Sequence, residues 1–257
     1  MRIAKFRTIA NLVALVALIS VPAIASAQAP AVDVEAIRLL RRMTNYLGGL
    51  QQFSVDTQTT VEAVLTSGQK LQFDTLNNVI VRRPDKLRGE RKGDLVRQTF
   101  YYDGKTLTIY NPVDKYYATV PAPDTLDEML HFARESLGIV APSGDLVYSN
   151  AYELLTHGVN WAIVVGKAVI TGVKCDHVAF SRPDLDFQVW IAEGDKPLPH
   201  KYVITTKDVP EQPQSVVIMT NWNVSPDLTN AMFTFMPPPG VTEIEFLRLT
   251  AAGASSR

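Results

Sequence analysis

The stretch Asp103-Gly104-Lys105 has the residue types of a phosphate or metal site. It is set, however, between β-branched and aromatic residues in TFYYDGKTLTIYNP (Thr99–Pro112). Asp-Gly between two such runs is a strong signal for a two-residue hairpin turn, because glycine adopts positive φ at no steric cost. We therefore predict a hairpin that pairs Tyr102 with Lys105 and places Lys105 in solvent or at the rim of the sheet, with no chemical role for this stretch.

Two pairs of residues with i, i+2 spacing carry the other reactive side chains. Cys175 and His177 would share one strand face as a thiol–imidazole pair, but neighbouring side chains on a strand diverge and no third group orients them. A buried cysteine and a hydrogen-bonded histidine are the favoured interpretation. Asp184 and Asp186 follow Pro183, so we interpret them as turn residues rather than calcium ligands.

The sequence lacks the common motifs of enzymes and cofactor sites. Its four histidines have no metal-ligand spacing, and it contains no G-x-S-x-G, H-E-x-x-H, P-loop or dinucleotide fingerprint. We therefore predict a binding protein rather than an enzyme, with no catalytic residue, no metal and no cofactor. A hydrolase that uses scattered acids remains the third alternative.

The N-terminus has the pattern of a secretory signal peptide. Three basic residues precede the apolar run Leu12–Ile19, and Ala25-Ser26-Ala27 gives a small-x-small cleavage site. We predict cleavage after Ala27, and no permanent membrane anchor, because the run is shorter than the ~20 residues of a spanning helix. No cysteine follows the run, as the lipoprotein pattern would require, so the mature chain is expected in the periplasm.

The charge of the chain limits which partners are expected, and its cysteine content limits what can stabilise the fold. The chain has 25 basic and 26 acidic residues, and removal of residues 1–27 takes away three basic residues and leaves a net charge of −4. An acidic protein of this kind gives no electrostatic reason to expect nucleic acid. Cys175 is the only cysteine, so stability must come from a hydrophobic core rather than from an internal disulfide.

Hydrophobic periodicity predicts one α+β domain over residues 28–250, followed by a disordered tail at 251–257. A helix with apolar residues at three- to four-residue intervals is expected near residues 34–47, and period-two alternation then begins at Phe53. About ten antiparallel strands are predicted, with Phe233 and Phe235 in the last. Their order is interrupted by a capped helix that starts at Thr125 and a second helix over about 145–157.

A series of motifs resembles a known superfamily of exported proteins. The hairpin DGKTLTIYNP, RPDKLR (Arg83–Arg88) and FTFMPPPGV (Phe233–Val241) resemble the periplasmic lipoprotein-sorting carriers and their mycobacterial lipid-transport relatives. Further motifs are similar to a family of predicted periplasmic proteins of unknown function in that superfamily: PAPDTLDEML (Pro121–Leu130), GVKCDHVAF (Gly172–Phe180), DFQVWIAEGDKPLPHKYVITTK (Asp186–Lys207) and IEFL (Ile244–Leu247).

The resemblance implies a curved, incomplete antiparallel β-barrel with helices over its open side. In the carriers, barrel and helical lid enclose an apolar cavity for acyl chains, and an arginine holds the lid closed; Arg82 and Arg83 are the nearest candidates here, with solvated strand-end charges as the alternative. The residues expected to line the cavity or the lid are Phe53, Val55, Phe73, Phe100, Leu107, Ile109, Leu126, Met129, Leu130, Ala133, Leu137 and Trp190.

Two functions follow as expectations. The first is a soluble periplasmic carrier or binder of a lipidic or otherwise apolar ligand, with lipid or lipoprotein acyl chains as partners. The alternative is a module with a filled core that binds an envelope protein or peptide, as a sensor or assembly factor, through exposed tyrosines: Tyr101, Tyr110, Tyr116 and Tyr117.

Overall fold

The structure is a computed structural model that describes residues 32–93 and 96–246 of the 257-residue chain. The predicted signal peptide and the predicted disordered tail lie outside the described residues. None of the helices in those two described ranges is long and apolar enough to cross a membrane.

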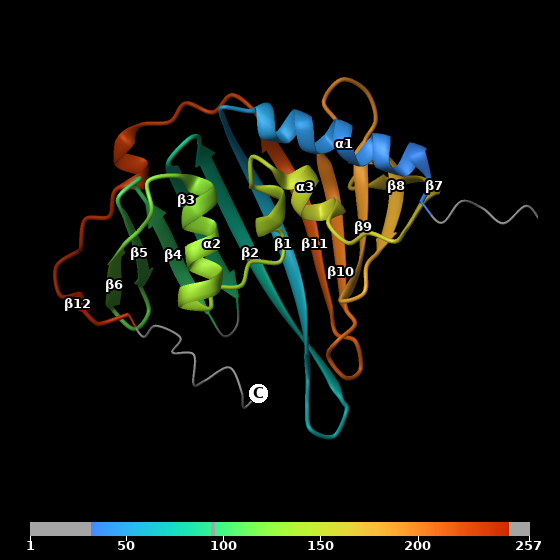
Figure 1. Ribbon diagram of the computed structural model, residues 1–257. Coiled ribbons are helices and arrows are strands. Elements are labelled where there is room, and N and C mark those ends of the chain that lie inside the picture. The colour runs from blue at the N-terminus through green and yellow to red at the C-terminus, as the bar shows by residue number, and fades with distance from the viewer. Residues whose placement is uncertain (1–31, 94–95, 247–257) are drawn as a thin grey trace, which may run out of the picture.

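One mixed sheet of twelve strands forms the frame of the molecule (Figure 1). The strand order is β12-β6-β5-β4-β3-β2-β1-β11-β10-β9-β8-β7, and every pairing is antiparallel except that of β12 with β6. The strands are β1 (Gln52–Val64), β2 (Lys70–Arg82), β3 (Lys86–Gly93), β4 (Arg97–Tyr102), β5 (Thr106–Asn111), β6 (Tyr116–Pro121), β7 (Trp161–Ile170), β8 (Val173–Ser181), β9 (Leu185–Ala192), β10 (Pro199–Thr206), β11 (Gln214–Asn223) and β12 (Thr242–Glu243).

The helices lie on one face of this curved sheet, which we call the inner face (Figure 1). Helix α1 (Val34–Gly49) contacts β7, β8 and β9, and α2 (Leu126–Leu137) lies over the half of the sheet that contains β3 to β5. The short helix α3 (Ala151–Thr156) lies between them and contacts α1. This arrangement confirms the predicted α+β half-barrel covered by helices.

The described residues form twelve strands, not about ten. The alternation of residues predicts separate strands over Leu71–Thr75 and Val79–Val81, but both belong to a single 13-residue strand, β2, which pairs with β1 along its whole length. The intervening Asn77 and Asn78 continue the strand because their side chains are hydrogen-bonded to threonines and to Asp56 of β1. Strand β12 exists only through its long-range pairing with β6, which local periodicity does not reveal.

Three local expectations are corrected. Phe233 is part of the 3₁₀ helix η2 (Asn230–Phe233), not of a strand, and its buried ring contacts the guanidinium of Arg82. The helix expected over 145–157 is divided into the 3₁₀ helix η1 (Gly144–Leu146) and α3. The hairpin pairs Tyr102 with Leu107, two residues from the expected register, because Asp103 accepts hydrogen bonds from the backbone of Lys105 and Thr106 and lengthens the turn.

The register error does not change which side chains share a face, because a shift of two residues preserves strand alternation. Phe100, Leu107 and Ile109 lie on the same face as predicted, and Lys105 is exposed as predicted. The core lies between the inner face and the helices, where Leu40 and Met43 of α1 are completely buried.

Candidate functional site

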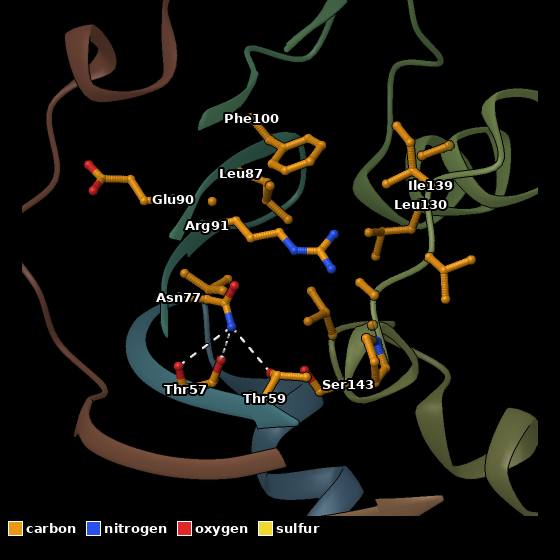
Figure 2. Close-up of a pocket in the computed structure, with 18 of the residues that line it drawn as sticks. Thr57, Thr59, Asn77, Leu87, Glu90, Arg91, Phe100, Leu130, Ile139 and Ser143 are labelled. Carbon is orange, nitrogen blue, oxygen red and sulfur yellow. Dashed lines mark hydrogen bonds between the residues drawn. The ribbon is translucent and has the colours of Figure 1, made fainter. Parts of the chain in front are cut away.

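A cavity of about 160 Å³ lies between the inner face and the segment that covers it. Strands β1 to β5 form its floor, and residues 126–147, here called the lid, form its roof. Lid residues that line it include Met129, Leu130, Ala133 and Ile139. Figure 2 shows Leu130 and Ile139 facing Phe100 and Leu87 of the sheet across this space.

The first helix of the lid has defined ends. The Thr125 hydroxyl accepts a hydrogen bond from the backbone N–H of Glu128 at 3.3 Å, as an N-cap does, and donates to Glu128 Oε2 at 3.0 Å. Gly138 ends α2 in the left-handed conformation. Leu126, Met129, Ala133 and Leu137 form the buried side of the helix, so the predicted apolar stripe faces the sheet.

Polar contacts attach both ends of the lid to the sheet. The Tyr102 hydroxyl donates to the carbonyl of Pro123 at 2.6 Å, and burial raises the pKa of this phenol. Arg83 Nη2 donates to the carbonyl of Val147 at 2.6 Å, and Arg83 Nη1 lies 3.9 Å from Asp127 Oδ1. Desolvation of the guanidinium lowers the pKa of Arg83, and the charge of Asp127 opposes this effect.

The two arginines considered at the strand end hold different segments. Arg83 contacts the lid and its side chain is 10% exposed. Arg82 donates instead to Asn230 Oδ1 at 2.5 Å and to the carbonyl of Leu228, so it holds the C-terminal segment. The interpretation as solvated charges is therefore wrong for Arg83.

The floor of the cavity contains a polar cluster. The amide nitrogen of Asn77 lies 3.0 Å from Thr57 Oγ1, 3.2 Å from Thr59 Oγ1 and 3.3 Å from Thr75 Oγ1 (Figure 2). The three threonines are buried. The β1–β2 register places Thr57 opposite Asn77 and Thr59 opposite Thr75, so the cluster follows from strand pairing.

Arg91 is the only basic side chain that lines the cavity among the described residues. It lies on β3, opposite Asn77 of β2 and Gln98 of β4. Figure 2 shows its guanidinium extended into the cavity, between Phe100 and Leu130. Desolvation by burial lowers the pKa of Arg91, and no charge among the described residues contributes to the shift.

The predicted site residues fall in different places. Phe100, Leu107, Met129, Leu130 and Ala133 line the cavity. Phe53, Val55, Leu126 and Leu137 belong to the surrounding core, Ile109 is half-buried opposite Phe100, and Phe73 is half-buried in the β1–β2 hairpin. Trp190 lies on the opposite, outer face, in a cluster with Cys175 and Val203.

The sequence did not lead us to predict the following parts of the site: the polar floor, Gly89, Arg91 and the part of the lid after Gly138. One signal for the floor was visible. Along one face of β1 the side chains change from Phe53 and Val55 to Thr57 and Thr59, and hydroxyls at inward positions indicate a change in what that face contacts.

The residue pairs with reactive side chains have other contacts. Burial raises the pKa of the Cys175 thiol to about 11, whereas a nucleophilic cysteine needs a lowered pKa. His177 stacks on Trp190 at 4.0 Å and its Nε2 lies 2.9 Å from Gln188. Within the described ranges, no group of three His, Cys, Asp or Glu side chains has the arrangement of a metal site.

The two carboxylates that we interpret as turn residues rather than calcium ligands are paired with basic side chains. Arg182 donates to both oxygens of Asp184, at 2.9 and 2.7 Å, and this pairing lowers the pKa of Asp184. Lys207 Nζ lies 3.0 Å from Asp186 Oδ1.

The tyrosines expected to be exposed are half-buried. Tyr101, Tyr110 and Tyr117 surround Phe235 on the outer face, with ring centroids 5.0 to 5.4 Å from that of Phe235. The chain's own C-terminal segment therefore occupies the surface that sequence analysis assigned to a partner.

Comparison with solved structures shows the class of the fold. The chain is similar to the lipoprotein LppX of Mycobacterium tuberculosis (TM-score 0.50, 16% identity, 77% of this chain and 100% of LppX). It also matches a LolA-superfamily protein of Nitrosomonas europaea (0.40, 11%, 78% and 97%) and MucB in the MucA/MucB complex of Pseudomonas aeruginosa (0.43, 16%, 78% and 61%). The fold is therefore that of LppX.

The family is defined more closely by sequence. Residues 36–247 match the profile of the predicted periplasmic proteins DUF2092, and the chain belongs to this family. Among curated protein sequences, none matches this chain significantly.

Proposed function

We propose that this protein binds or carries a lipidic or otherwise apolar ligand in the periplasm, with the lid cavity as its site and without catalysis. The observation that carries the proposal is a cavity with apolar walls, formed by Leu87 and Phe100 of the sheet and by Met129, Leu130 and Ile139 of the lid. Each methylene group moved from water into such a space contributes about 0.8 kcal/mol.

The volume limits how much ligand the cavity holds in this conformation. A cavity of about 150 Å³ takes a molecule the size of benzene, so 160 Å³ accommodates about six carbon atoms. Ligand sites of drug-sized molecules are usually about 300–1,000 Å³. A longer chain must extend out of the cavity or displace the segment 139–144, where Val140 is 69% exposed.

A substitution at Gly89 tests the site without removing an existing contact. Gly89 lines the cavity, and an added Cβ would meet only Phe100, at 3.9 Å. Gly89→Leu therefore places a side chain in the space proposed for the ligand. The matched control is Gly49→Leu at the exposed end of α1, where an added Cβ meets nothing within 4 Å.

Binding of 1-octanol, a neutral single-chain probe, is measured by isothermal titration calorimetry. The unsubstituted protein and Gly49→Leu are expected to bind it with equal affinity, and Gly89→Leu is expected to lose at least about tenfold. An unchanged affinity in Gly89→Leu, or no binding by any of the three, would overturn the proposal.

Location and natural ligand are tested together. We expect the protein recovered from the periplasmic fraction to have a mass that corresponds to a chain starting at Gln28, folded as one domain over 28–250. Native mass spectrometry should show an adduct in the mass range of a lipid. A ligand-free protein that crosslinks to a single envelope protein in cells would instead favour the protein-binding alternative.

A further inference from the structure

Arg91 differs from the half-buried Arg83 and Arg182 in having no hydrogen-bond or ion-pair partner among the residues that the structure describes. Arg83 donates to a backbone carbonyl and faces Asp127, and Arg182 binds both oxygens of Asp184. The residues that the structure describes provide neither a hydrogen-bond acceptor nor a carboxylate within contact distance of the Arg91 guanidinium, and burial is the sole cause of its lowered pKa.

The acidic residue that precedes Arg91 in the sequence faces another direction. Glu90 is among the residues that line the cavity, but its carboxylate points away from the Arg91 guanidinium (Figure 2). Its carboxylate pairs with Arg88 and lies 3.1 Å from Lys92 Nζ. The positive charge of Arg91 is therefore not neutralised by its own strand. Arginine stays protonated in proteins, so a partly buried guanidinium without a counter-charge has an unfavourable desolvation free energy.

The polar floor adds hydrogen-bond donors to the same space. The hydroxyl oxygens of Thr57, Thr59 and Thr75 lie within hydrogen-bond distance of the Asn77 amide nitrogen, whose two hydrogens serve at most two of them fully, and the described part of the chain offers no acceptor for the hydroxyl hydrogens. A threonine hydroxyl has one hydrogen to donate besides its lone pairs. Arg91 supplies up to five N–H donors in a planar fork, so the cavity combines apolar walls with unused donors at one side.

From this juxtaposition we infer that the cavity selects a single-chain amphiphile whose head group is an oxyanion, either a carboxylate or a phosphate. The head group pairs with Arg91, and the chain contacts Leu130, Ile139 and Phe100. The inference rests on the proposed function and narrows its ligand class. The guanidinium fork matches the two oxygens of a carboxylate or phosphate, and a free inorganic anion would leave the apolar walls unused.

The test compares two probes of equal chain length on two forms of the full protein. Octanoate and 1-octanol are titrated at pH 8 into the unsubstituted protein and into Arg91→Gln. Hydrogen bonds to charged groups are stronger than neutral ones. Octanoate is therefore expected to bind the unsubstituted protein at least about tenfold more tightly than octanol does. Arg91→Gln should abolish that difference and leave octanol affinity within about twofold.

Two further variants separate charge, geometry and folding. Arg91→Lys keeps the charge without the planar fork and should retain only part of the preference. Arg97→Gln removes an exposed arginine from the neighbouring strand β4 and should change neither probe's affinity. Equal melting temperatures of Arg91→Gln and Arg97→Gln exclude loss of folding as the cause.

Each outcome separates the inference from the proposed function. Octanol binding without a preference for octanoate, or a preference that survives Arg91→Gln, overturns the inference and leaves the proposed function intact. Absence of binding by both probes overturns the proposed function itself. If octyl phosphate binds with the affinity of octanoate, the site accepts oxyanion head groups in general. If inorganic phosphate binds as tightly as octanoate, the requirement for an alkyl chain is overturned.

Discussion

The inner face of the sheet is filled under α1 and hollow under the lid. Under α1, Phe180 and Phe187 stack at 4.7 Å, and Tyr202 meets Phe187 edge-on at 6.1 Å. Under the lid, the corresponding positions are taken by small or polar side chains, Thr59 and Gly89 among them. The same backbone architecture therefore produces a core or a cavity, and side-chain volume at inward positions decides between them.

Helix α1 and the lid are also attached to the sheet differently. Helix α1 is held by completely buried apolar residues such as Leu40 and Met43. The lid has apolar contacts along α2, but its ends are held by polar groups, Tyr102 to Pro123 and Arg83 to Val147. Segments with fewer buried apolar contacts open at lower free energy, so we expect the lid to open before α1 separates from the sheet.

The largest expected effect is on the filled half. Phe187→Ala removes a ring that is 1% exposed, and a phenylalanine-to-alanine change in a core costs about 3–5 kcal/mol of unfolding free energy. Phe100→Ala, in the hollow half, removes a half-buried ring next to an existing cavity and should cost less than half as much. Urea unfolding of the two variants measures this difference, and equal losses would contradict the contrast between the halves.

The next effect concerns attachment of the lid. Arg83→Met keeps the apolar stem but removes the donors to Val147, and the loss of a charged hydrogen bond should cost about 1.5–3 kcal/mol. Hydrogen exchange should accelerate over residues 126–147 and not over α1. Arg82→Met is the matched control, because Arg82 contacts Leu228 and Asn230; faster exchange of the lid in this variant would disprove the separate roles.

Substitution of the N-cap residues compares α1 with α2, and its expected effect on stability is smaller. Asp33 accepts a hydrogen bond from Glu35 N at the start of α1, and Thr125 caps α2. Asp33→Ala and Thr125→Ala should each cost about 1 kcal/mol, measured by thermal unfolding. Only Thr125→Ala should also weaken binding of octanol, since α2 lines the cavity. An equal effect of both variants on binding would show that α1 contributes to the site.

The same contrast explains what the sequence predicts and what it does not. Period-two alternation is a local property, so it identifies β1 and places Phe53, Val55, Thr57 and Thr59 on one face. Whether that face meets a helix or a cavity depends on long-range pairing and on the position of the lid. Arg91 ends a predicted strand, but its direction into the cavity requires the β2–β3 register and the lid above it.

The position of the C-terminal segment is a second feature that local sequence patterns do not predict. Phe235 lies in a motif that local pattern assigns to a strand, yet its position is set by contacts with Tyr101, Tyr110 and Tyr117, more than 100 residues earlier in the chain. Three of the four tyrosines predicted to contact a partner therefore pack against the chain's own C-terminal segment.

The smallest expected effect is a pH dependence that arises from two histidines on β8 and β10, the strands of the half of the sheet that α1 covers. Burial lowers the pKa of His177 on β8 and of His200 on β10 below 6.5; Lys201 lowers that of His177 further, and a hydrogen bond to Gln188 opposes this. The unfolded chain therefore binds protons at higher pH than the folded chain, and stability declines as the pH falls from 6.5 to the lower pKa of the folded state. Urea unfolding between pH 8 and 5 should show this decline in the unsubstituted protein and a smaller one in His177→Gln and in His200→Gln. A decline of undiminished size in a variant that lacks both histidines would show that other groups, and not these two histidines, govern the acid sensitivity of the fold.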